Sequence, residues 1–362
     1  MKTIVISGIN LFEGGPLSIY YDLLDTIVEN DIYNKYSIVI FVHKKELFKQ
    51  YNNFVTIIEL PLARKNYLNR LYYEYVYFYK YSKKRDIDIW ISLHDITPRV
   101  VAKKQYTYCH NPSPFMKKDI SKIKYSIKNV MFSFFYKYLY RINIKSACAI
   151  IVQQNWIRKE FLEMYPVKSV VVARPNFEID YTFEKIDKLN KKKIFIFPAY
   201  PRFFKNYEVI CEAVKLLDNY DFEVLFTLDG SENQYSKDVY KKYGTLKQIK
   251  WLGLLDRNHV FELYNKSDCL IFPSKLETWG LPISEYKLTG KPIILSDLPY
   301  AYETLGCYEK CNFFDPTNSK ELAKYMENII LEKDIYNPQY SEKFDEPFFE
   351  CWEDLLDYIF KI

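Results

Sequence analysis

The sequence lacks any long apolar run. Its most apolar segments, such as Thr3–Ile9 and Ile194–Pro198, are well below the ~20 residues that a membrane-spanning helix needs. The chain also begins directly with a predicted strand, without the features of a cleaved signal segment. We therefore expect neither a transmembrane nor a secreted protein, and predict a cytoplasmic location.

Glycine is scarce, and the cysteines follow no recognisable pattern. Nine glycines stand against 35 tyrosines and 26 phenylalanines, a bias that codon usage in an AT-rich genome explains without a functional role. Seven cysteines, an odd number scattered over 362 residues, do not predict a disulfide framework. Cys307 and Cys311 are spaced C-x3-C, but no second pair and no nearby histidine completes a metal site. We interpret them as buried or incidental thiols.

The net charge of +5 is mild, but two stretches concentrate it. Arg64 to Arg85 carries seven basic residues and seven tyrosines against Glu74, and Lys117 to Lys145 carries eight basic residues against Asp119. A basic helix with an aromatic face can lie on an anionic membrane surface. An ordinary helix whose apolar stripe packs inward while lysines face water fits equally well. Peripheral binding to the inner membrane face is therefore one of two open interpretations.

A chain of 362 residues exceeds what one hydrophobic core usually serves, so two domains are expected. Each half alternates short β-rich runs with helical patterns, which predicts a parallel sheet covered on both faces. Arg174-Pro175-Asn176 interrupts the pattern, so we predict domains over residues 1–175 and 176–345, with a helix over 346–362 that packs back across the boundary. The predicted strands are Thr3–Ile9, Ser37–Val42, Thr56–Leu60, Ile87–Leu93, Tyr106–Cys109, Cys148–Gln153, Lys193–Pro198, Phe222–Leu228, Lys250–Leu252, Cys269–Phe272, Pro292–Leu295 and Asn312–Phe314.

The strongest motif is Glu277-Thr-Trp-Gly-Leu-Pro-Ile-Ser-Glu285, directly after a predicted strand. Its proline suits the first turn of a helix over 281–289, so the loop Trp279, Gly280, Leu281 is expected to present unpaired backbone amides, a natural seat for a diphosphate. Glu285, expected in the first turn, could bind a ribose diol, and Glu277 could hold sugar hydroxyls. Alternatively, both glutamates simply favour the helix dipole.

The spacing of Glu277 and Glu285 resembles the E-x7-E signature of retaining glycosyltransferases of family 4. The resemblance spans nearly the whole chain and is strongest from Phe197 to Pro316, where Gly290-Lys-Pro292 and Phe314-Asp-Pro316 follow in the expected order. It implies the GT-B architecture, two facing Rossmann-like domains with a cleft between them. It also implies a retaining, metal-independent enzyme of the hexosyltransferase type, with the nucleotide-sugar donor in the C-terminal domain and a glycan or lipid-linked glycan acceptor in the N-terminal domain.

A second element of the resemblance is Phe197-Pro-Ala-Tyr-Pro-Arg202-Phe-Phe-Lys205-Asn206. The family has an arginine and a lysine here that bind the donor diphosphate, which implies this role for Arg202 and Lys205. A leaving nucleoside diphosphate gains negative charge in the transition state, and cations can stabilise it. Ala199 stands where the family usually has glycine, which leaves the closeness of the backbone to the phosphate open. The two cations could instead belong to a solvated helix start.

In the N-terminal half, Gly14-Gly15 follows the first predicted strand and resembles the family's glycine loop, which approaches donor phosphate or acceptor. We assign Gly15 to the donor and Gly14 to the acceptor, although a Gly-Gly pair can also merely shape a turn. His110, at a predicted strand end, resembles the family's histidine near the donor sugar. His94, at the adjacent strand end, is the competing candidate and is assigned to the acceptor. A structural role remains the alternative for both histidines.

Asp86-Ile-Asp88 matches a metal-binding D-x-D pattern, but it opens a predicted strand after a basic stretch, and no other carboxylates converge there in the sequence. We therefore expect no metal, no cofactor and no nucleic-acid partner. Two other functions stay open: a GT-B enzyme that hydrolyses or epimerises a nucleotide sugar, and a non-catalytic module that binds one.

Overall fold

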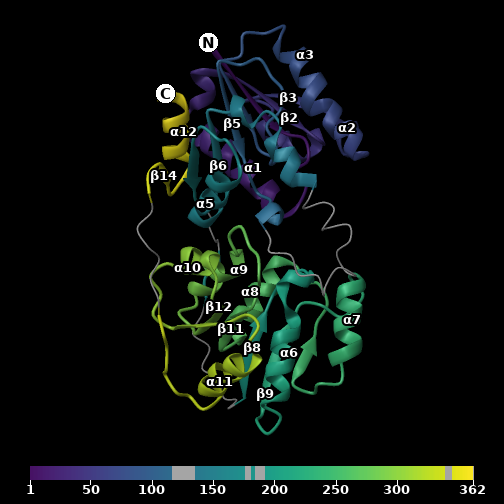
Figure 1. The fold of residues 1–362 in the computed structure, drawn as a ribbon, viewed down its shortest axis with the longest axis vertical. Coiled ribbons are helices and arrows are strands. Elements are labelled where there is room, and N and C mark those ends of the chain that lie inside the picture. The colour runs from purple at the N-terminus through teal and green to yellow at the C-terminus, as the bar shows by residue number, and fades with distance from the viewer. Residues whose placement is uncertain (116–134, 176–180, 184–191, 339–344, 362) are drawn as a thin grey trace. The chain divides into compact units, whose positions relative to one another are not determined.

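A computed structural model describes residues 1–115, 135–175, 181–183, 192–338 and 345–361 of the chain (Figure 1). The chain divides into two compact units. Of the described residues, unit 1 contains 1–115, 135–175 and 345–361, and unit 2 contains 181–183 and 192–338. The second basic stretch lies outside the described residues up to position 134.

Unit 1 is built on an eight-stranded sheet with the strand order β14-β7-β6-β5-β4-β1-β2-β3, and every neighbouring pair is parallel. Most of the central strands are apolar along their whole length because both faces of a parallel sheet are covered. The strands are β1 (Lys2–Gly8), β2 (Tyr36–Val42), β3 (Thr56–Glu59), β4 (Ile89–Ser92), β5 (Lys104–Tyr108), β6 (Ala149–Val152), β7 (Val170–Ala173) and β14 (Phe348–Phe349).

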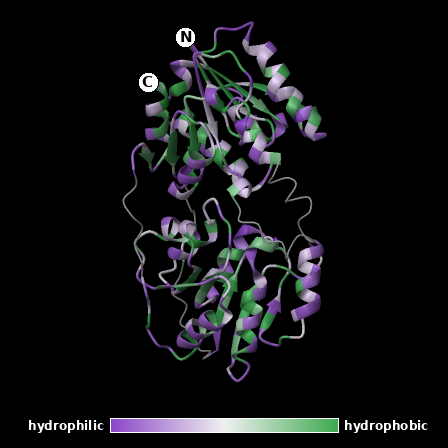
Figure 2. Cartoon of the chain, viewed as in Figure 1, coloured by the Kyte–Doolittle hydropathy of each residue, from purple (hydrophilic) through white to green (hydrophobic). Residues whose placement is uncertain are grey.

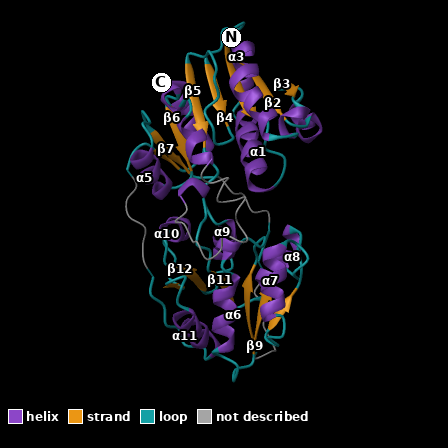
Figure 3. Cartoon of the chain, turned by 45° about the vertical axis from the view of Figure 1, so that its right-hand side comes forward, coloured by secondary structure: helices purple, strands orange, loops and turns teal. Residues whose placement is uncertain are grey.

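The helices of unit 1 pack on this sheet (Figure 3). A single core cluster joins Leu23 and Ile27 of α1 to Trp352, Leu355 and Ile359 of α12, all buried. The helices are α1 (Gly14–Glu29), α2 (Tyr67–Tyr72), α3 (Phe78–Ser82), α5 (Asn155–Met164) and α12 (Trp352–Lys361), with a π-helical turn at Tyr73–Tyr77 between α2 and α3. Residues 135–141 are also helical.

The end of the chain belongs to unit 1. β14 pairs with β7, with Phe348 opposite Val172, and the Trp352 ring stacks on Tyr108 at 5.5 Å between ring centroids. The sequence pattern predicted a helix over 346–362, but the helix begins at Trp352 because Phe348 and Phe349 form a strand. Both β7 and β14 escaped prediction, since four and two residues are too few to display a periodic pattern.

Unit 2 contains a six-stranded parallel sheet with the order β10-β9-β8-β11-β12-β13. Its strands are β8 (Lys193–Phe197), β9 (Phe222–Phe226), β10 (Ile249–Trp251), β11 (Cys269–Phe272), β12 (Ile293–Ser296) and β13 (Cys311–Phe314). Its helices are α6 (Tyr207–Lys215), α7 (Gln234–Tyr243), α8 (Arg257–Lys266), α9 (Leu281–Lys287), α10 (Pro299–Leu305) and α11 (Ser319–Ile330).

The strands of both sheets are mainly apolar, whereas the helices alternate apolar and polar residues (Figure 2). Within each sheet the order of the strands reverses once, at β1/β4 in unit 1 and at β8/β11 in unit 2. Ligands of open parallel sheets bind outside the carboxyl ends of the strands at such a reversal. The predicted pair of doubly wound parallel sheets is therefore confirmed. In each unit, the strand reversal marks the edge of the sheet where a ligand is expected. The cleft between the two domains stays a prediction.

Candidate functional site

The carboxyl ends of β8 and β11 carry most of the predicted site in unit 2. A short 3-10 turn (Phe203–Lys205) follows β8, and the loop Pro273–Gly280 follows β11. The Lys275 amide donates to the Phe204 carbonyl at 2.7 Å, and the buried Asn206 side chain donates to the Pro273 carbonyl at 3.2 Å. These bonds hold the two loops together at the reversal of strand order.

Lys205 and Glu277 meet across these two loops. The Lys205 ammonium bonds to the Glu277 carboxylate, and the two side chains are 15% and 13% exposed. The ammonium also lies 5.3 Å from the centre of the Phe272 ring. An ammonium has three donors and a carboxylate two oxygens, so the pair keeps capacity for a ligand on both partners. The structure thus places a cation and an anion side by side at the end of the sheet.

Arg202 stands at the start of the same turn. Its side chain is exposed, and the guanidinium lies 5.9 Å from the centre of the Tyr200 ring. At the position where the family usually has glycine, the Ala199 amide donates to Thr227 at 3.0 Å. The Ala199 amide is therefore engaged within the protein.

The turn Trp279, Gly280, Leu281 depends on a glycine. Gly280 has φ of +89° at the N-cap of α9, in the left-handed region that side chains disfavour, and an added Cβ would lie 3.2 Å from Ile283. The Trp279 indole donates to Ser284 at 3.0 Å, and Thr304 donates to the Trp279 carbonyl. The turn is thus braced on both sides.

Fewer amides are open at this turn than the sequence predicted. Pro282 has no N–H, and the Ile283 amide donates to the Gly280 carbonyl at 2.9 Å. The amides of Gly280 and Leu281 remain as candidate donors. Because α9 has only seven residues, a diphosphate here would depend on these two amides and on nearby cations more than on the helix itself.

The prediction that Glu285 lies in the first helical turn is wrong. α9 begins at Leu281, so Glu285 is its fifth residue, and the side chain points into the domain with an exposed fraction of 7% for the residue. It accepts hydrogen bonds from Arg257 and from the Tyr264 hydroxyl, both at 3.1 Å. Burial raises the pKa of Glu285, although both partners act to lower it.

Arg257 and Tyr264 were missed by the sequence interpretation. Both lie on α8, a different helix from that of Glu285, and neither belongs to a recognisable motif. Only the folding of the chain brings them into contact with Glu285. The Arg257 side chain is 56% exposed, whereas Tyr264 is fully buried. Glu285 is therefore held by one inner and one outer donor.

In unit 1, Gly14 and Gly15 are the first two residues of α1, which follows β1. Gly14 has φ of +65°, and a Cβ added to either glycine would meet nothing within 4 Å. No side chain caps α1, and its first turn contains no acidic residue. The helix end is consequently left without a side-chain partner, as a glycine loop that approaches a ligand requires.

His110 follows β5 and is held by the loop that follows β4. Its Nε2 donates to the Leu93 carbonyl at 2.6 Å, and its backbone amide donates to Asp95 at 2.7 Å. Burial lowers the pKa of His110, against opposing contributions from Asp95 and the Leu93 carbonyl. The imidazole is therefore neutral at pH 7, with the proton on Nε2 and an enclosed Nδ1 that has no hydrogen-bond partner among the described residues.

His94 lies on that same loop, but its side chain is 1% exposed. Its Nδ1 is 2.9 Å from the carboxylate of Glu74, which is fully buried. The structure thus brings His94 next to His110 in space without giving its ring access to a ligand. Its predicted contact with an acceptor has no support in this geometry, because the ring is enclosed by the protein.

Asp86 and Asp88 both form ion pairs with a lysine of the protein. Lys103 contacts both carboxylates, at 3.3 Å and 2.7 Å, and Asp88 also accepts the Thr3 amide at 2.8 Å. Within the described ranges, no group of three or more His, Cys, Asp or Glu side chains is arranged to hold a metal ion. The seven cysteines are free thiols, with Cys307 exposed and Cys311 buried.

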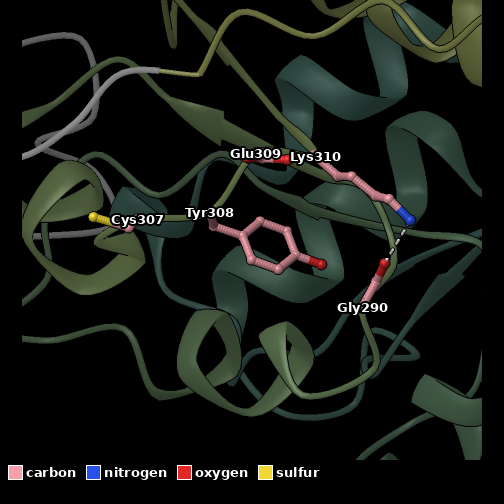
Figure 4. Close-up of a pocket in the computed structure, with 5 residues that line it drawn as sticks. All are labelled: Gly290, Cys307, Tyr308, Glu309 and Lys310. Atoms are coloured by element: carbon pink, nitrogen blue, oxygen red, sulfur yellow. Dashed lines mark hydrogen bonds between the residues drawn. The ribbon is translucent and has the colours of Figure 1, made fainter.

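The pocket drawn in Figure 4 is not lined by any of the predicted site residues. It is lined by Gly290, Cys307, Tyr308, Glu309 and Lys310, which precede β12 and β13 and so lie at the amino ends of the strands. The Lys310 ammonium donates to the Gly290 carbonyl at 3.2 Å, and the Tyr308 hydroxyl donates to the Lys291 backbone carbonyl at 2.6 Å. Because ligands of such sheets bind at the opposite edge, we do not assign the site to this pocket.

Comparison with known protein families finds a match that spans unit 2. Residues 178–346 match the family described as Glycosyl transferases group 1. This part of the chain is therefore similar to group 1 glycosyltransferase domains.

Two curated relatives that match the chain are named as glycosyltransferases. The chain is 26% identical over 217 residues to the processive diacylglycerol alpha-glucosyltransferase of Acholeplasma laidlawii. This alignment covers 56% of the present chain and 63% of that relative. It is 20% identical over 199 residues to an uncharacterized glycosyltransferase of Methanocaldococcus jannaschii, covering 51% of each. The matches thus span about half to two thirds of these relatives' lengths.

Solved structures extend the likeness to both units. HepE of Anabaena in complex with UDP-glucose aligns with a TM-score of 0.62 and 15% identity, over 92% of this chain and 90% of that chain. Sucrose-phosphate synthase of Thermosynechococcus elongatus aligns with a TM-score of 0.64 and 12% identity over the same shares. The fold is therefore that of the GT-B glycosyltransferases, two parallel-sheet α/β domains. Among the described residues, no helix is long and apolar enough to cross a membrane.

Proposed function

We propose that the chain is a glycosyltransferase that transfers a sugar from a nucleotide-sugar donor to an acceptor. The observation that carries this proposal is the Lys205–Glu277 ion pair at the carboxyl ends of β8 and β11, inside the part of the chain that is similar to group 1 glycosyltransferase domains. A neighbour of the same fold, HepE, is known in complex with UDP-glucose. The strand reversal is the place where such a sheet binds nucleotides.

In this proposal Lys205 and Arg202 bind the donor diphosphate together with the amides of Gly280 and Leu281. Glu277 orients the Lys205 ammonium and uses its second oxygen to accept a hydroxyl of the donor sugar. The negative charge on the diphosphate grows as the glycosidic bond breaks, so the two cations stabilise the transition state more than the ground state. Glu285 accepts the ribose hydroxyls, and Trp279 keeps the turn in place.

Unit 1 contributes the acceptor side and one face of the donor sugar. Gly14 and Gly15 leave space for a ligand beyond β1. His110 accepts a sugar hydroxyl through Nδ1, the ring nitrogen that has no partner among the described residues. The E-x7-E resemblance supports retention at the anomeric carbon and membership of family 4. We further propose that the reaction needs no metal, because two cations and two amides are available to the diphosphate.

Donor binding is the direct test. A panel of nucleotide sugars, with UDP-glucose included, is added to the full chain and the thermal unfolding midpoint is measured. A bound donor at 100 times its Kd stabilises the fold by about 2.7 kcal/mol, which raises the midpoint by several degrees. If no nucleotide sugar shifts the midpoint, the proposal fails. Product that forms without any acceptor would instead identify a hydrolase or epimerase, and binding without turnover a non-catalytic module.

Activity is expected to survive EDTA. The measurement is transfer of labelled sugar after dialysis against chelator, with and without added Mn²⁺ or Mg²⁺. The diphosphate charge is met by Lys205 and Arg202 in this proposal, so the rates should agree within about two-fold. Loss of activity that Mn²⁺ or Mg²⁺ restores would contradict the metal-independent mechanism and would direct attention to acidic residues again.

The surface of unit 1 favours a lipid-linked acceptor. Several large apolar side chains of residues 65–77 and 135–142 are exposed, and the rings of Tyr67 and Phe135 lie 6.3 Å apart, so the two segments adjoin. Exposed basic residues surround them, and the one acidic residue of these two segments, Glu74, is buried. We call this the apolar–basic surface. Its members are Lys65, Tyr67, Leu68, Tyr72, Val76, Phe135, Lys137, Tyr138, Arg141 and Ile142.

We propose that this surface binds the anionic headgroup layer of a membrane where a lipid-linked acceptor is held. Each basic residue near an anionic surface contributes about 1 kcal/mol, and an apolar side chain that enters the layer contributes about 1.5–3 kcal/mol. A curated relative acts on diacylglycerol according to its name, which supports a lipid acceptor. The enzyme would then be cytoplasmic and peripheral, and part of glycoconjugate or polysaccharide biosynthesis.

Replacing Leu68 and Tyr72 by serine should lower binding to anionic vesicles by at least about ten-fold, since both side chains would leave the headgroup layer. The measurement is co-sedimentation at low ionic strength with anionic and neutral vesicles. Leu162→Ser is the matched control, because Leu162 is 55% exposed on α5 of the same unit. Equal and negligible binding of the unmodified chain to both kinds of vesicle would favour a soluble acceptor.

A further inference from the structure

The segment Tyr67–Tyr77 has two opposite faces. Leu68, Tyr72 and Val76 follow one another at intervals of four residues and are 76%, 48% and 37% exposed. Arg70 and Glu74, also four residues apart, are 6% and 0% exposed. Residues four apart share a helix face, so the polar pair lies on the inner side. Glu74 belongs to the π-helical turn Tyr73–Tyr77, and π-helical turns are frequently found at functional sites.

The inner pair is attached to the loop that follows β4. The Arg70 guanidinium donates to the His94 carbonyl at 2.8 Å and to the Tyr136 hydroxyl. The Glu74 carboxylate lies 2.9 Å from Nδ1 of His94, within ion-pair distance although not aligned as a hydrogen bond. The backbone carbonyl of Glu74 accepts the Arg99 amide at 2.9 Å, which fastens the far end of the same loop.

The loop in turn holds His110. Leu93 supplies the carbonyl that accepts from Nε2 of His110, and one oxygen of Asp95 accepts the amides of His110 and Asn111 at 2.7 and 3.0 Å. Asp95 has φ of +73°, a strained backbone for a residue other than glycine, which persists only where the surroundings hold it. Leu93 and Asp95, on either side of His94, thus hold His110, and the Leu93 carbonyl favours the Nε2–H tautomer.

A role in stability alone is a poor explanation for the inner pair. Burying ionisable side chains is costly, and replacing them by apolar side chains of similar volume is often neutral or stabilising. Yet Arg70 and Glu74 are both polar, and several buried polar atoms around them have no hydrogen-bond partner among the described residues, including both Glu74 oxygens, Nε2 of His94 and the Tyr75 hydroxyl. Native proteins leave few buried polar atoms unpaired, so such a concentration calls for an explanation other than packing.

We propose that Glu74 and Arg70 are positioning residues for His110, acting through the loop Leu93, His94, Asp95. Glu74 attracts the His94 ring and Arg70 binds the His94 carbonyl, which fixes the carbonyl and the carboxylate that hold the His110 imidazole. The consequence is an imidazole with its proton on Nε2 and with Nδ1 reserved for a hydroxyl. The catalytic part of this inference rests on the proposed function, because a donor sugar is what would supply that hydroxyl.

The structural part is tested without any substrate. The chain has only four histidines, so each imidazole can be assigned by nitrogen-15 NMR of single His→Gln variants. We expect the Nε2–H tautomer for His110 in the unmodified chain and a mixture of tautomers in Glu74→Gln and in Arg70→Lys. Glu46→Gln is the matched control, since Glu46 is an exposed carboxylate of the same unit paired with Lys49. An unchanged His110 signal in both variants, with thermal unfolding like that of the control, would overturn the proposal. Arg70→Lys keeps the charge and serves if Glu74→Gln does not fold.

The catalytic part is tested by a double-mutant cycle. Small misplacement of a group at the reacting centre costs up to about 10² in rate, so Glu74→Gln should lower kcat by about 10–100-fold. In a His110→Ala background the same change should have no further effect, because its route to the reaction has been removed. Additive losses would contradict a role through His110. If the tautomer shifts while no nucleotide sugar binds or reacts, the positioning stands and the proposed function is what fails.

Discussion

Lys205→Ala should reduce turnover with saturating donor by about 10²–10³-fold, and Arg202→Ala should act in the same direction. The two cations meet a diphosphate whose charge increases as the sugar leaves, so the loss falls on kcat more than on donor affinity. Steady-state kinetics together with donor calorimetry separates the two quantities. Lys215→Ala is the matched control, because Lys215 is a partly exposed, ion-paired lysine of the same domain.

Lys205→Ala also leaves the carboxylate of Glu277 without its partner, and both side chains are mostly buried. The unpaired charge should lower the free energy of unfolding by about 1–3 kcal/mol, and adding Glu277→Gln should recover part of it. This double variant distinguishes a catalytic loss from a folding loss, since stability returns while turnover does not. Full turnover in both Lys205→Ala and Arg202→Ala would mean that the diphosphate binds elsewhere.

Glu285→Gln should weaken donor binding by about 1.5–3 kcal/mol, on the order of 10–150-fold in Kd, with a smaller effect on kcat. A carboxylate accepts ribose hydroxyls through charge-assisted hydrogen bonds, and glutamine keeps the volume while it removes the charge. Calorimetry with the donor found by thermal screening makes the measurement. Glu262→Gln, at an exposed glutamate on α8, is the matched control.

The same residue predicts a pH dependence. Burial raises the pKa of Glu285 above the ordinary value of 4.5, so the carboxylate takes up a proton at a higher pH than a solvated glutamate. Donor affinity should therefore fall as the pH decreases through that raised pKa, because the protonated group loses acceptor strength. Glu285→Gln should lack this acidic decline. A decline of equal size in the variant would assign it to another group.

The sequence alone predicted the fold class, which the structure confirms, and proposed most of the candidate site residues. Apolar runs such as Ile4–Ile6 and Leu270–Phe272 are too continuous for half-exposed strands, so a parallel sheet follows from the sequence pattern. Gly280 and Pro282 are local signals, since the backbone at each position tolerates few alternatives. For the same reason the end of β11 and the turn that follows it could be predicted from residues near in sequence.

The tertiary structure decided which side chains meet. Lys205 and Glu277 are 72 residues apart, and only the adjacency of β8 and β11 turns them into a pair. Arg257 and Tyr264 became partners of Glu285 because α8 packs beside α9, and Glu285 lies one turn deeper than its sequence position suggested. Likewise, Glu74 seemed a lone acid in a basic stretch, but the π-helical turn directs it inward to His94. Local sequence sets backbone conformation through sterics, whereas contacts between distant residues depend on how strands are ordered in the sheet, and no local pattern encodes that order.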